Sequence, residues 1–274
     1  ALENGADMVV TSLHKTLPAL TQCALLHVGG DLVDYTSLQR ALSIFQTSSP
    51  SYLLLSSIDQ CVRLLTEQKD RLFADYIAHL DAFDQHIQPL KTLKVLCHGA
   101  DSLQRHPAFY RFDPGKLVIS TRGTTLTGPQ LAQILRQDYG IELEMAYTDY
   151  AIAMTSIGDT ADGFQRLARA LIAIDSSLQP SAVKPAAFTP TLPPCRMRAF
   201  EALLRKGRPV ALKQARGHMS LEYVWAYPPG IPLIVPGEVV DGHTIDQIHA
   251  LLAAGVELFS TNGGRPGVLT VASF

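Results

Sequence analysis

Three side chains with the chemistry to hold an aldehyde cofactor follow a short apolar run near the start of the chain. Ser12, His14 and Lys15 follow Met8-Val9-Val10 and Thr11, where a strand is expected to pass into a loop. A primary amine there can form a Schiff base with an aldehyde such as pyridoxal 5'-phosphate (PLP), if partial desolvation makes its neutral form accessible. A hydroxyl and an imidazole beside it can bind a phosphate group. On spacing alone, Lys15 fits an ordinary solvated loop lysine better.

A second cluster of hydroxyls precedes an expected helix. Thr47, Ser48 and Ser49 lie directly before Pro50. Hydroxyls and unpaired backbone N–H groups at a helix start suit an anion such as phosphate. The alternative is an ordinary N-cap with a proline in the first turn, which the residue types alone favour.

The segment 227–238 is the most distinctive part of the sequence. Its prolines and glycines are Pro228, Pro229, Gly230, Pro232, Pro236 and Gly237. These residues are expected to hold an otherwise apolar run in a fixed, irregular path. The rigid loop ends in Glu238, with Asp241 close behind, so it can present carboxylates to a cation. A structural loop with a solvated acidic end fits the composition equally well.

The elements that must position these side chains are readable from apolar periodicity and from proline and glycine. Strands are expected at 8–10, 23–28, 93–96, 117–119, 141–145, 151–155 and 210–213. Helices are expected at 35–45, from 52 toward 87, and at 128–139, 162–178, 196–205 and 245–254. This mixture predicts an α/β or α+β fold. Five prolines within 179–194 predict a semi-extended linker.

Composition limits the function classes. The 274 residues are 47% hydrophobic, with a formal net charge of −2. That balance offers no general attraction for nucleic acid or an anionic membrane, and no apolar run approaches the roughly 20 residues of a membrane span. The four cysteines form no CxxC pair, so no metal site is expected. They fit reduced, mostly buried thiols, which favours a cytoplasmic location.

Taken together, the three segments 5–22, 47–52 and 227–238 carry a family resemblance through their order and spacing. The chain resembles the Orn/Lys/Arg decarboxylases, PLP-dependent enzymes of the aspartate-aminotransferase fold, and most of all the short arginine decarboxylase type. The resemblance runs over essentially all 274 residues. One departure is Leu13, where the family usually has threonine; we expect this position to face away from the cofactor.

The resemblance implies a role for each candidate residue. Lys15 forms the Schiff base with PLP, and Ser12 and His14 contact the cofactor phosphate. Because these enzymes build their sites at a dimer interface, the stretch Thr47-Ser48-Ser49 is expected to reach the phosphate of the neighbouring subunit. Glu238 is expected near the substrate entrance.

The activity implied is decarboxylation of a basic amino acid, a carbon–carbon lyase reaction in polyamine biosynthesis. Arginine, giving agmatine, is the first candidate substrate, with lysine and ornithine as alternatives. The implied protein is a homodimer or higher oligomer. A second hypothesis is a non-catalytic assembly or regulatory subunit of such a decarboxylase. Lys15, Ser12 and His14 favour the enzyme, since a non-catalytic subunit has no chemical need for the lysine.

The resemblance also implies that part of the cofactor site is missing. In this family the ring of PLP is held by groups well upstream of the lysine, whereas only 14 residues precede Lys15. We therefore expect the C-terminal part of a fold-type I large domain over 1–90, followed by a small α/β domain over 91–178. A linker over 179–194 and a C-terminal α+β decarboxylase domain over 195–274 complete the expected order. Such a chain is expected to need the N-terminal half and to be inactive alone.

Overall fold

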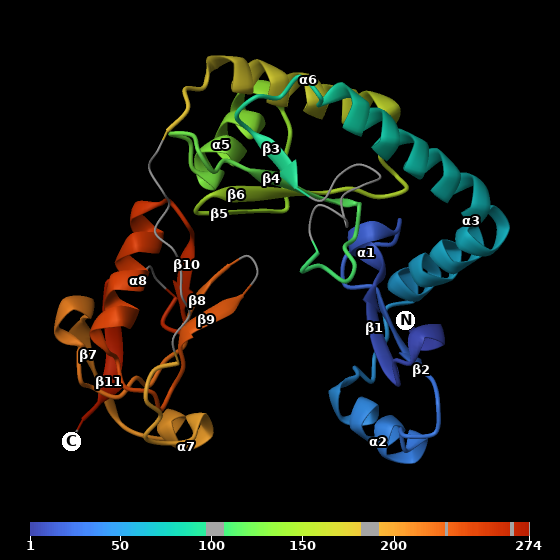
Figure 1. Ribbon diagram of the computed structural model, residues 1–274. Helices are drawn as coiled ribbons and strands as arrows, with labels where there is room; N and C mark the ends of the chain where they lie inside the picture. The colour runs from blue at the N-terminus through green and yellow to red at the C-terminus, as the bar shows by residue number, and fades with distance from the viewer. Residues whose placement is uncertain (97–106, 182–191, 228–229, 264–265, 274) are drawn as a thin grey trace. The chain divides into compact units, whose positions relative to one another are not determined.

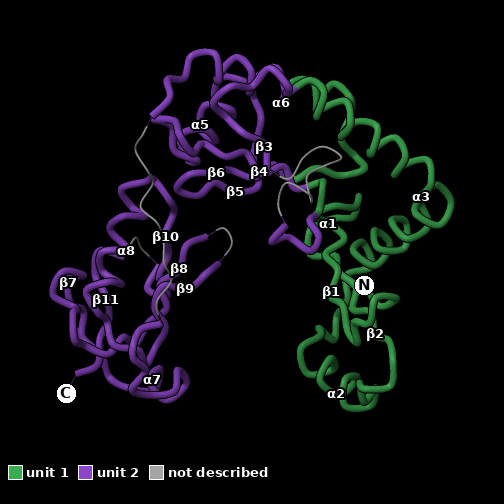
Figure 2. Tube along the Cα trace, in the orientation of Figure 1, with its two compact units in different colours: residues 1–86, 113–115, 154–166 green, residues 87–112, 116–153, 167–274 purple. Residues whose placement is uncertain are grey.

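The computed structural model describes residues 1–96, 107–181, 192–227, 230–263 and 266–273. These residues form two compact units (Figure 2). The first unit contains Ala1–His86, Asp113–Gly115 and Met154–Arg166. The second contains Ile87–Phe112, Lys116–Ala153 and Leu167–Phe274. Cys97 and most of the expected linker lie outside the described residues, as do Pro228 and Pro229.

The first unit is built on an antiparallel strand pair and long helices (Figure 1). A 3₁₀ turn, η1 (Leu2–Asn4), leads into β1 (Met8–Ser12), which pairs with β2 (Ala24–Val28). The four-residue helix α1 (Leu13–Thr16) follows β1 directly. Helices α2 (Tyr35–Phe45) and α3 (Tyr52–His86) come next. The loop that was expected to carry His14 and Lys15 is therefore a helical turn.

Aromatic packing closes the core of the first unit. The buried side chains of α3 are Cys61, Leu80 and Phe83. Phe164, near the start of α6 (Ala161–Ser177), packs edge-on against Phe83 with ring centroids 6.1 Å apart. Tyr76 of α3 hydrogen-bonds the Thr155 hydroxyl at 2.6 Å, which ties the helix to a segment 79 residues away.

A four-stranded sheet with helices forms one part of the second unit. Its strand order is β3 (Lys94–Leu96), β4 (Lys116–Ser120), β6 (Tyr150–Met154) and β5 (Met145–Tyr147). Helix α5 (Gly128–Tyr139) begins at a capping box formed by Thr127 and Gln130, and it ends at Gly140, whose φ is +64°. The fully buried core side chains here are Leu93, Leu117, Ile119, Leu131, Leu135 and Leu171.

The rest of the second unit contains two further small sheets. Helix α7 (Ala199–Leu203) precedes β7 (Gly207–Ala211), which pairs with β11 (Val268–Ala272); the 3₁₀ turn η2 (Leu212–Gln214) follows β7. Strands β8 (Val224–Ala226), β9 (Ile231–Ile234) and β10 (Leu258–Ser260) form a sheet in the order β10-β8-β9. Helix α8 (Gly242–Ala253) contributes Ile245, Ile248 and Leu251 to the core that these strands share.

The strand predicted over 141–145 is wrong, because β5 begins only at Met145. The backbone N–H of Ile141 donates to the carbonyl of Leu135 at 2.9 Å, so it completes the C-terminal cap of α5 and is not available to a strand. Alternation of apolar and acidic residues is therefore misleading directly after a helix.

Three further predictions need correction. The helix expected at 196–205 is only Ala199–Leu203, and the strand expected at 210–213 is β7 over Gly207–Ala211, with η2 after it. The segment 227–238 is not irregular throughout, since it contains β9. Pro232 lies opposite Trp225 in that strand. Strand β9 is an edge strand, with a neighbouring strand on one side only. Edge strands are where a proline, which has no N–H to donate, is tolerated.

Candidate functional site

Lys15 lies on the helical turn α1, at the C-terminal end of β1. The turn is fixed from beneath by Leu13, whose side chain is 3% exposed and whose backbone N–H donates to the Cys23 carbonyl at 3.0 Å. The side chain of Lys15 is exposed. The residue that departs from the family pattern is thus buried in the core, and the lysine two positions later faces outward.

His14 is held by the same backbone carbonyl. Its Nδ1 lies 3.0 Å from the Cys23 oxygen, and because a carbonyl oxygen only accepts, Nδ1 carries the hydrogen. Nε2 is then an acceptor in the neutral ring and a second donor in the protonated ring. The thiol of Cys23 is buried and donates to the Leu54 carbonyl of α3 at 3.5 Å. The imidazole is therefore oriented by a backbone contact that is itself anchored to α3.

Ser12 completes the group on this turn. It is the N-cap residue of α1, yet its hydroxyl makes no capping hydrogen bond to the helix. The side chain is half-buried. The structure thus brings Ser12, His14 and Lys15 together within one turn of backbone, as their sequence positions predict.

The hydroxyls of Thr47, Ser48 and Ser49 lie elsewhere in the first unit. They are exposed in the connection between α2 and α3, and Ser49 N–H donates to Thr47 Oγ1 at 3.1 Å. The N-cap interaction of α3 comes from Ser51, whose Oγ accepts from Leu54 N–H at 3.4 Å. Figure 1 draws α1 and α2 at opposite ends of the β1–β2 pair.

Glu238 belongs to the second unit, in a tightly constrained turn. Its Oε2 accepts from Val235 N–H at 2.9 Å. The preceding Gly237 has φ +94°, and a Cβ there would lie 2.1 Å from the Met197 carbonyl oxygen. Asp241 caps α8 by accepting from Thr244 N–H at 2.7 Å; this bond outweighs burial and lowers the pKa of Asp241. Both carboxylates are therefore oriented by backbone groups of their own segment.

One part of the Lys15 surroundings could not be found from residue types. The carbonyl of Cys23 accepts both Leu13 N–H and His14 Nδ1–H. A backbone carbonyl leaves no trace in the residue types, so the sequence carries no signal for this contact beyond the start of the β2 run.

The described ranges contain neither a candidate metal site nor a candidate membrane span. There, no group of three or more His, Cys, Asp or Glu side chains is placed to hold a metal ion. In the same residues, no helix is both long enough and apolar enough to cross a membrane.

Comparison with protein families places the chain in a class. Residues 2–160 match the Orn/Lys/Arg decarboxylase major domain, and residues 182–259 match the Orn/Lys/Arg decarboxylase C-terminal domain. The first match alone covers more than half of the 274 residues. The chain belongs to the Orn/Lys/Arg decarboxylase family, and the resemblance carried by segments 5–22, 47–52 and 227–238 is confirmed.

Individual relatives refine this assignment. The arginine decarboxylase of Bacillus subtilis (strain 168) is 30% identical over 259 residues, which are 93% of this chain and 52% of the relative. That of Bacillus anthracis is 29% identical, with the same coverage. The expected similarity to the short arginine decarboxylase type is thus confirmed. The chain spans about half the length of the curated relatives it matches.

Solved structures confirm the mixed helix-and-sheet fold. The constitutive lysine decarboxylase of E. coli superimposes with a TM-score of 0.75 at 20% identity, covering 97% of this chain and 49% of that one. The lysine decarboxylase LdcF of Francisella novicida gives a TM-score of 0.71 at 17% identity, covering 96% and 48%. The expected relation to the C-terminal part of the PLP fold-type I architecture agrees with these matches.

Proposed function

We propose that this chain contributes the lysine-bearing part of a PLP-dependent decarboxylase for basic amino acids, with arginine as the first candidate substrate and agmatine as product. Lysine and ornithine are the alternatives, and polyamine biosynthesis is the proposed role. The observation that carries the proposal is the placement of Ser12, His14 and Lys15 within one turn of backbone at the end of β1, with the Lys15 side chain exposed. The family, and two relatives named arginine decarboxylase, support the choice of reaction and substrate.

The residues of this turn fit PLP. The exposed side chain of Lys15 ends in an amine that can hold the cofactor through its aldehyde. The Ser12 hydroxyl, which does not cap α1, and Nε2 of His14, whose Nδ1 is already engaged, can hold the phosphate. When bound, PLP supplies an electron sink that allows the bond from Cα to the carboxylate to break.

Three groups of the chain would have separate roles once PLP is bound. Lys15 would hold the cofactor, and its side-chain nitrogen is a base that can carry a proton. A protonated His14 ring would donate from Nε2 to the phosphate, and such a charge-assisted bond is stronger than a neutral one. The Cys23 carbonyl keeps the ring in one orientation, so Nε2 points the same way in both protonation states.

Glu238 is our candidate for holding the distal cation near the substrate entrance. A guanidinium or ammonium group needs a carboxylate partner, and a guanidinium favours both oxygens of one carboxylate. The bond from Val235 N–H to Oε2 fixes the direction in which this carboxylate points, and the close approach of Gly237 to the Met197 carbonyl fixes the backbone beside it. Rigid placement is what a substrate contact requires.

We propose that Thr47, Ser48 and Ser49 reach the phosphate in a neighbouring subunit of a homodimer or higher oligomer. Their hydroxyls are exposed, and Ser51 takes the capping role at α3 instead. Large apolar side chains flank the stretch, with Phe45 at 88% and Tyr52 at 82% exposure. Apolar surface of this kind marks an interaction site in a soluble protein.

The site also needs further residues of the PLP-binding domain. An isolated two-stranded sheet is marginal in water, and β1 exposes Met8 and Val10. The relatives are about twice as long as this chain. We propose the domain order large domain 1–90, small domain 91–178, linker 179–194 and C-terminal domain 195–274. The chain alone is proposed to be inactive, and the assembled enzyme to be cytoplasmic.

Borohydride reduction tests this proposal. The chain is incubated with PLP, alone and together with the polypeptide that carries the rest of the PLP-binding domain, then reduced and digested. Mass spectrometry should find the pyridoxyl group on Lys15 when both parts are present. Release of carbon dioxide from arginine, lysine and ornithine, measured in parallel, identifies the substrate. An unlabelled Lys15 in the reconstituted protein would contradict the proposal that the chain is part of an enzyme. The alternative, a non-catalytic assembly or regulatory subunit, would then remain.

A further inference from the structure

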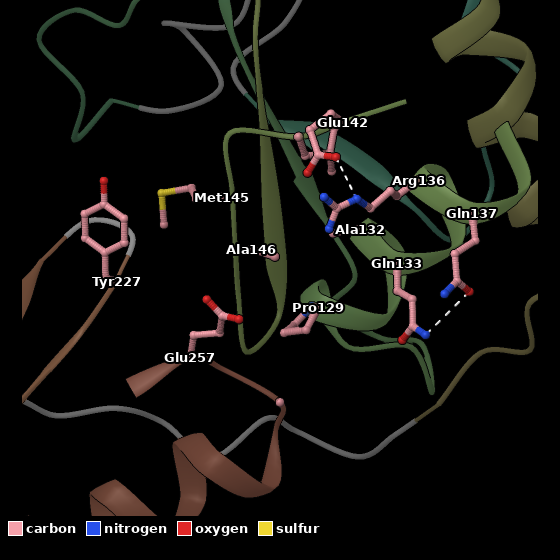
Figure 3. Close-up of a pocket in the computed structure, with 12 residues that line it drawn as sticks. Pro129, Ala132, Gln133, Arg136, Gln137, Glu142, Met145, Ala146, Tyr227 and Glu257 are labelled. Atoms are coloured by element: carbon pink, nitrogen blue, oxygen red, sulfur yellow. Dashed lines mark hydrogen bonds and ion pairs between the residues drawn. The ribbon is translucent and has the colours of Figure 1, made fainter. Parts of the chain in front are cut away.

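The second unit contains an open cavity of about 470 Å³ (Figure 3). One wall comes from α5, from the chain that leads into β5, and from the first residues of β5. The opposite wall comes from Tyr227 after β8 and from Gly255 and Glu257 before β10. No residue of β1 or α1 lines this cavity.

The cavity presents three charged side chains among its lining residues: Arg136, Glu142 and Glu257. Arg136 Nε and Glu142 Oε2 form an ion pair at 2.8 Å, and both side chains are well exposed. Figure 3 shows this pair on one side of the cavity and the Glu257 carboxylate apart from it. One cation and two carboxylates leave the lining with a net charge of −1.

The groups between these charges suit a short hydrocarbon chain. Pro129, Met145 and Ala146 are apolar lining residues, and Figure 3 draws Ala146 between the ion pair and Glu257 and Met145 on the side toward Tyr227. Tyr227 supplies an aromatic ring on the side opposite α5, within the same lining. An aromatic face attracts an ammonium or guanidinium group in addition to any carboxylate contact.

We propose that this cavity binds a basic α-amino acid as a second, non-catalytic site. Such a molecule carries one carboxylate and two cations at neutral pH, which mirrors one cation and two carboxylates in the lining. The α-carboxylate would pair with Arg136 and the α-ammonium with Glu142. The distal cation would pair with Glu257 beside Tyr227, and the methylenes would lie over Met145 and Ala146.

The same charges discriminate against the decarboxylated amine. Agmatine keeps the distal guanidinium but has no carboxylate, so it leaves Arg136 without an anion from the ligand. It also places its remaining ammonium near the arginine. We therefore expect the site to distinguish an amino acid from its decarboxylation product, which is the property of a sensor for substrate supply.

Calorimetric titration of the full chain tests the proposal without any decarboxylation. The titrations use protein with Lys15→Ala and no PLP, so that the catalytic turn cannot supply the signal. Arginine should bind, and agmatine should bind at least about tenfold more weakly. Glu257→Gln and Arg136→Gln should each weaken arginine binding by at least about tenfold, since each removes a charge-assisted contact.

A matched control separates a local contact from a general charge effect. Asp246→Asn removes one negative charge from an exposed position of α8 outside the cavity, and it should leave arginine affinity unchanged. Arginine binding that is equal in Glu257→Gln and in the parent would overturn the proposal, as would the absence of any binding at millimolar arginine. The result is independent of the borohydride test, so either proposal can fail alone.

Discussion

The carboxylate of Asp175 in α6 accepts a hydrogen bond from the backbone N–H of Leu93 at 2.7 Å, across 82 residues of sequence. The N–H groups of Lys91 and Thr92 donate to the same carboxylate, each at 2.8 Å. Asp175 is 6% exposed. One buried side chain thus accepts hydrogen bonds from the backbone N–H groups of the three residues immediately before β3. It thereby fixes the start of that strand to α6.

Asp175→Asn should destabilise the protein by about 2–3 kcal/mol. The charged acceptor is lost, and the NH₂ group of the asparagine amide faces backbone N–H groups that are donors themselves. Chemical denaturation followed by circular dichroism measures the change. Asp138→Asn, which alters an exposed aspartate of α5, is the matched control and should shift the free energy of unfolding by less than about 0.5 kcal/mol. A loss of equal size in both variants would show that the three backbone bonds carry no special weight.

The stabilisation by Asp175 should depend on pH. Burial alone would raise the pKa of Asp175, but the three backbone N–H groups and the charge of Lys91 outweigh burial and lower the pKa below its ordinary value. A carboxyl group whose pKa is lower in the folded state contributes stability that is fully present above its unfolded pKa of about 3.9 and is lost as pH falls through the folded pKa. Denaturation curves from pH 7 to pH 3 should therefore converge for the parent and Asp175→Asn only at the acidic end.

Glu222 should show the opposite pH dependence. It is 1% exposed, and burial raises its pKa even though the backbone N–H of Thr270 and the groups of Ser260 and Asn262 act in the other direction. A raised pKa in the folded state means that stability falls as pH rises from the unfolded pKa through the folded pKa. Glu222→Gln should remove this decline, so the variant should be at least as stable as the parent at pH 7. A large loss at pH 7 would show that the charged form is needed.

Lys15 and Leu13 should separate chemistry from stability. Lys15→Ala should abolish pyridoxyl labelling in the reconstituted enzyme but change the free energy of unfolding by less than about 0.5 kcal/mol, because the side chain is exposed. Leu13→Ala should cost about 2–4 kcal/mol, because it empties a buried position on the same turn. If Lys15→Ala were the destabilising variant, the lysine would have a structural role.

Gly128 marks a close approach between α5 and the β5–β6 hairpin. A Cβ at this position would lie 2.1 Å from the carbonyl oxygens of both Tyr147 and Tyr150. A side chain could rotate away from the new methyl group, but these carbonyl groups belong to the backbone and cannot. Gly128→Ala should therefore cost about 3 kcal/mol of stability. Gly158→Ala, where the nearest atom is 3.5 Å away, is the comparison and should be close to neutral in thermal unfolding.

Local signals predicted most elements of the fold. The apolar spacing was sufficient to predict α3, and Gly128-Pro129 and Gly140 were sufficient to predict the two ends of α5. These signals work because a helix and its ends are determined by residues close together in sequence. The false strand at 141–145 shows where this fails, since the Ile141 N–H turns back to Leu135. The contact of Asp175 with Leu93 joins positions too far apart for any local pattern to show.

The candidate site also contains one part that the sequence predicts and one part that depends on the fold. Ser12, His14 and Lys15 share one turn because they are neighbours in sequence, so their proximity followed from spacing. The Cys23 carbonyl that orients His14 depends on how β2 returns beside β1, which residue types do not encode. The roles proposed for Thr47, Ser48, Ser49 and Glu238 stay predictions.

Pro232 has a consequence beyond its place in β9. A sheet edge grows by offering a row of backbone donors and acceptors to another strand, and a proline removes one donor from that row. Strand β9 forms one edge of the β10-β8-β9 sheet, next to the exposed side chains of Tyr227 and Ile231. The interrupted edge disfavours the addition of a foreign strand there, and so protects an apolar surface of this chain against intermolecular sheet formation.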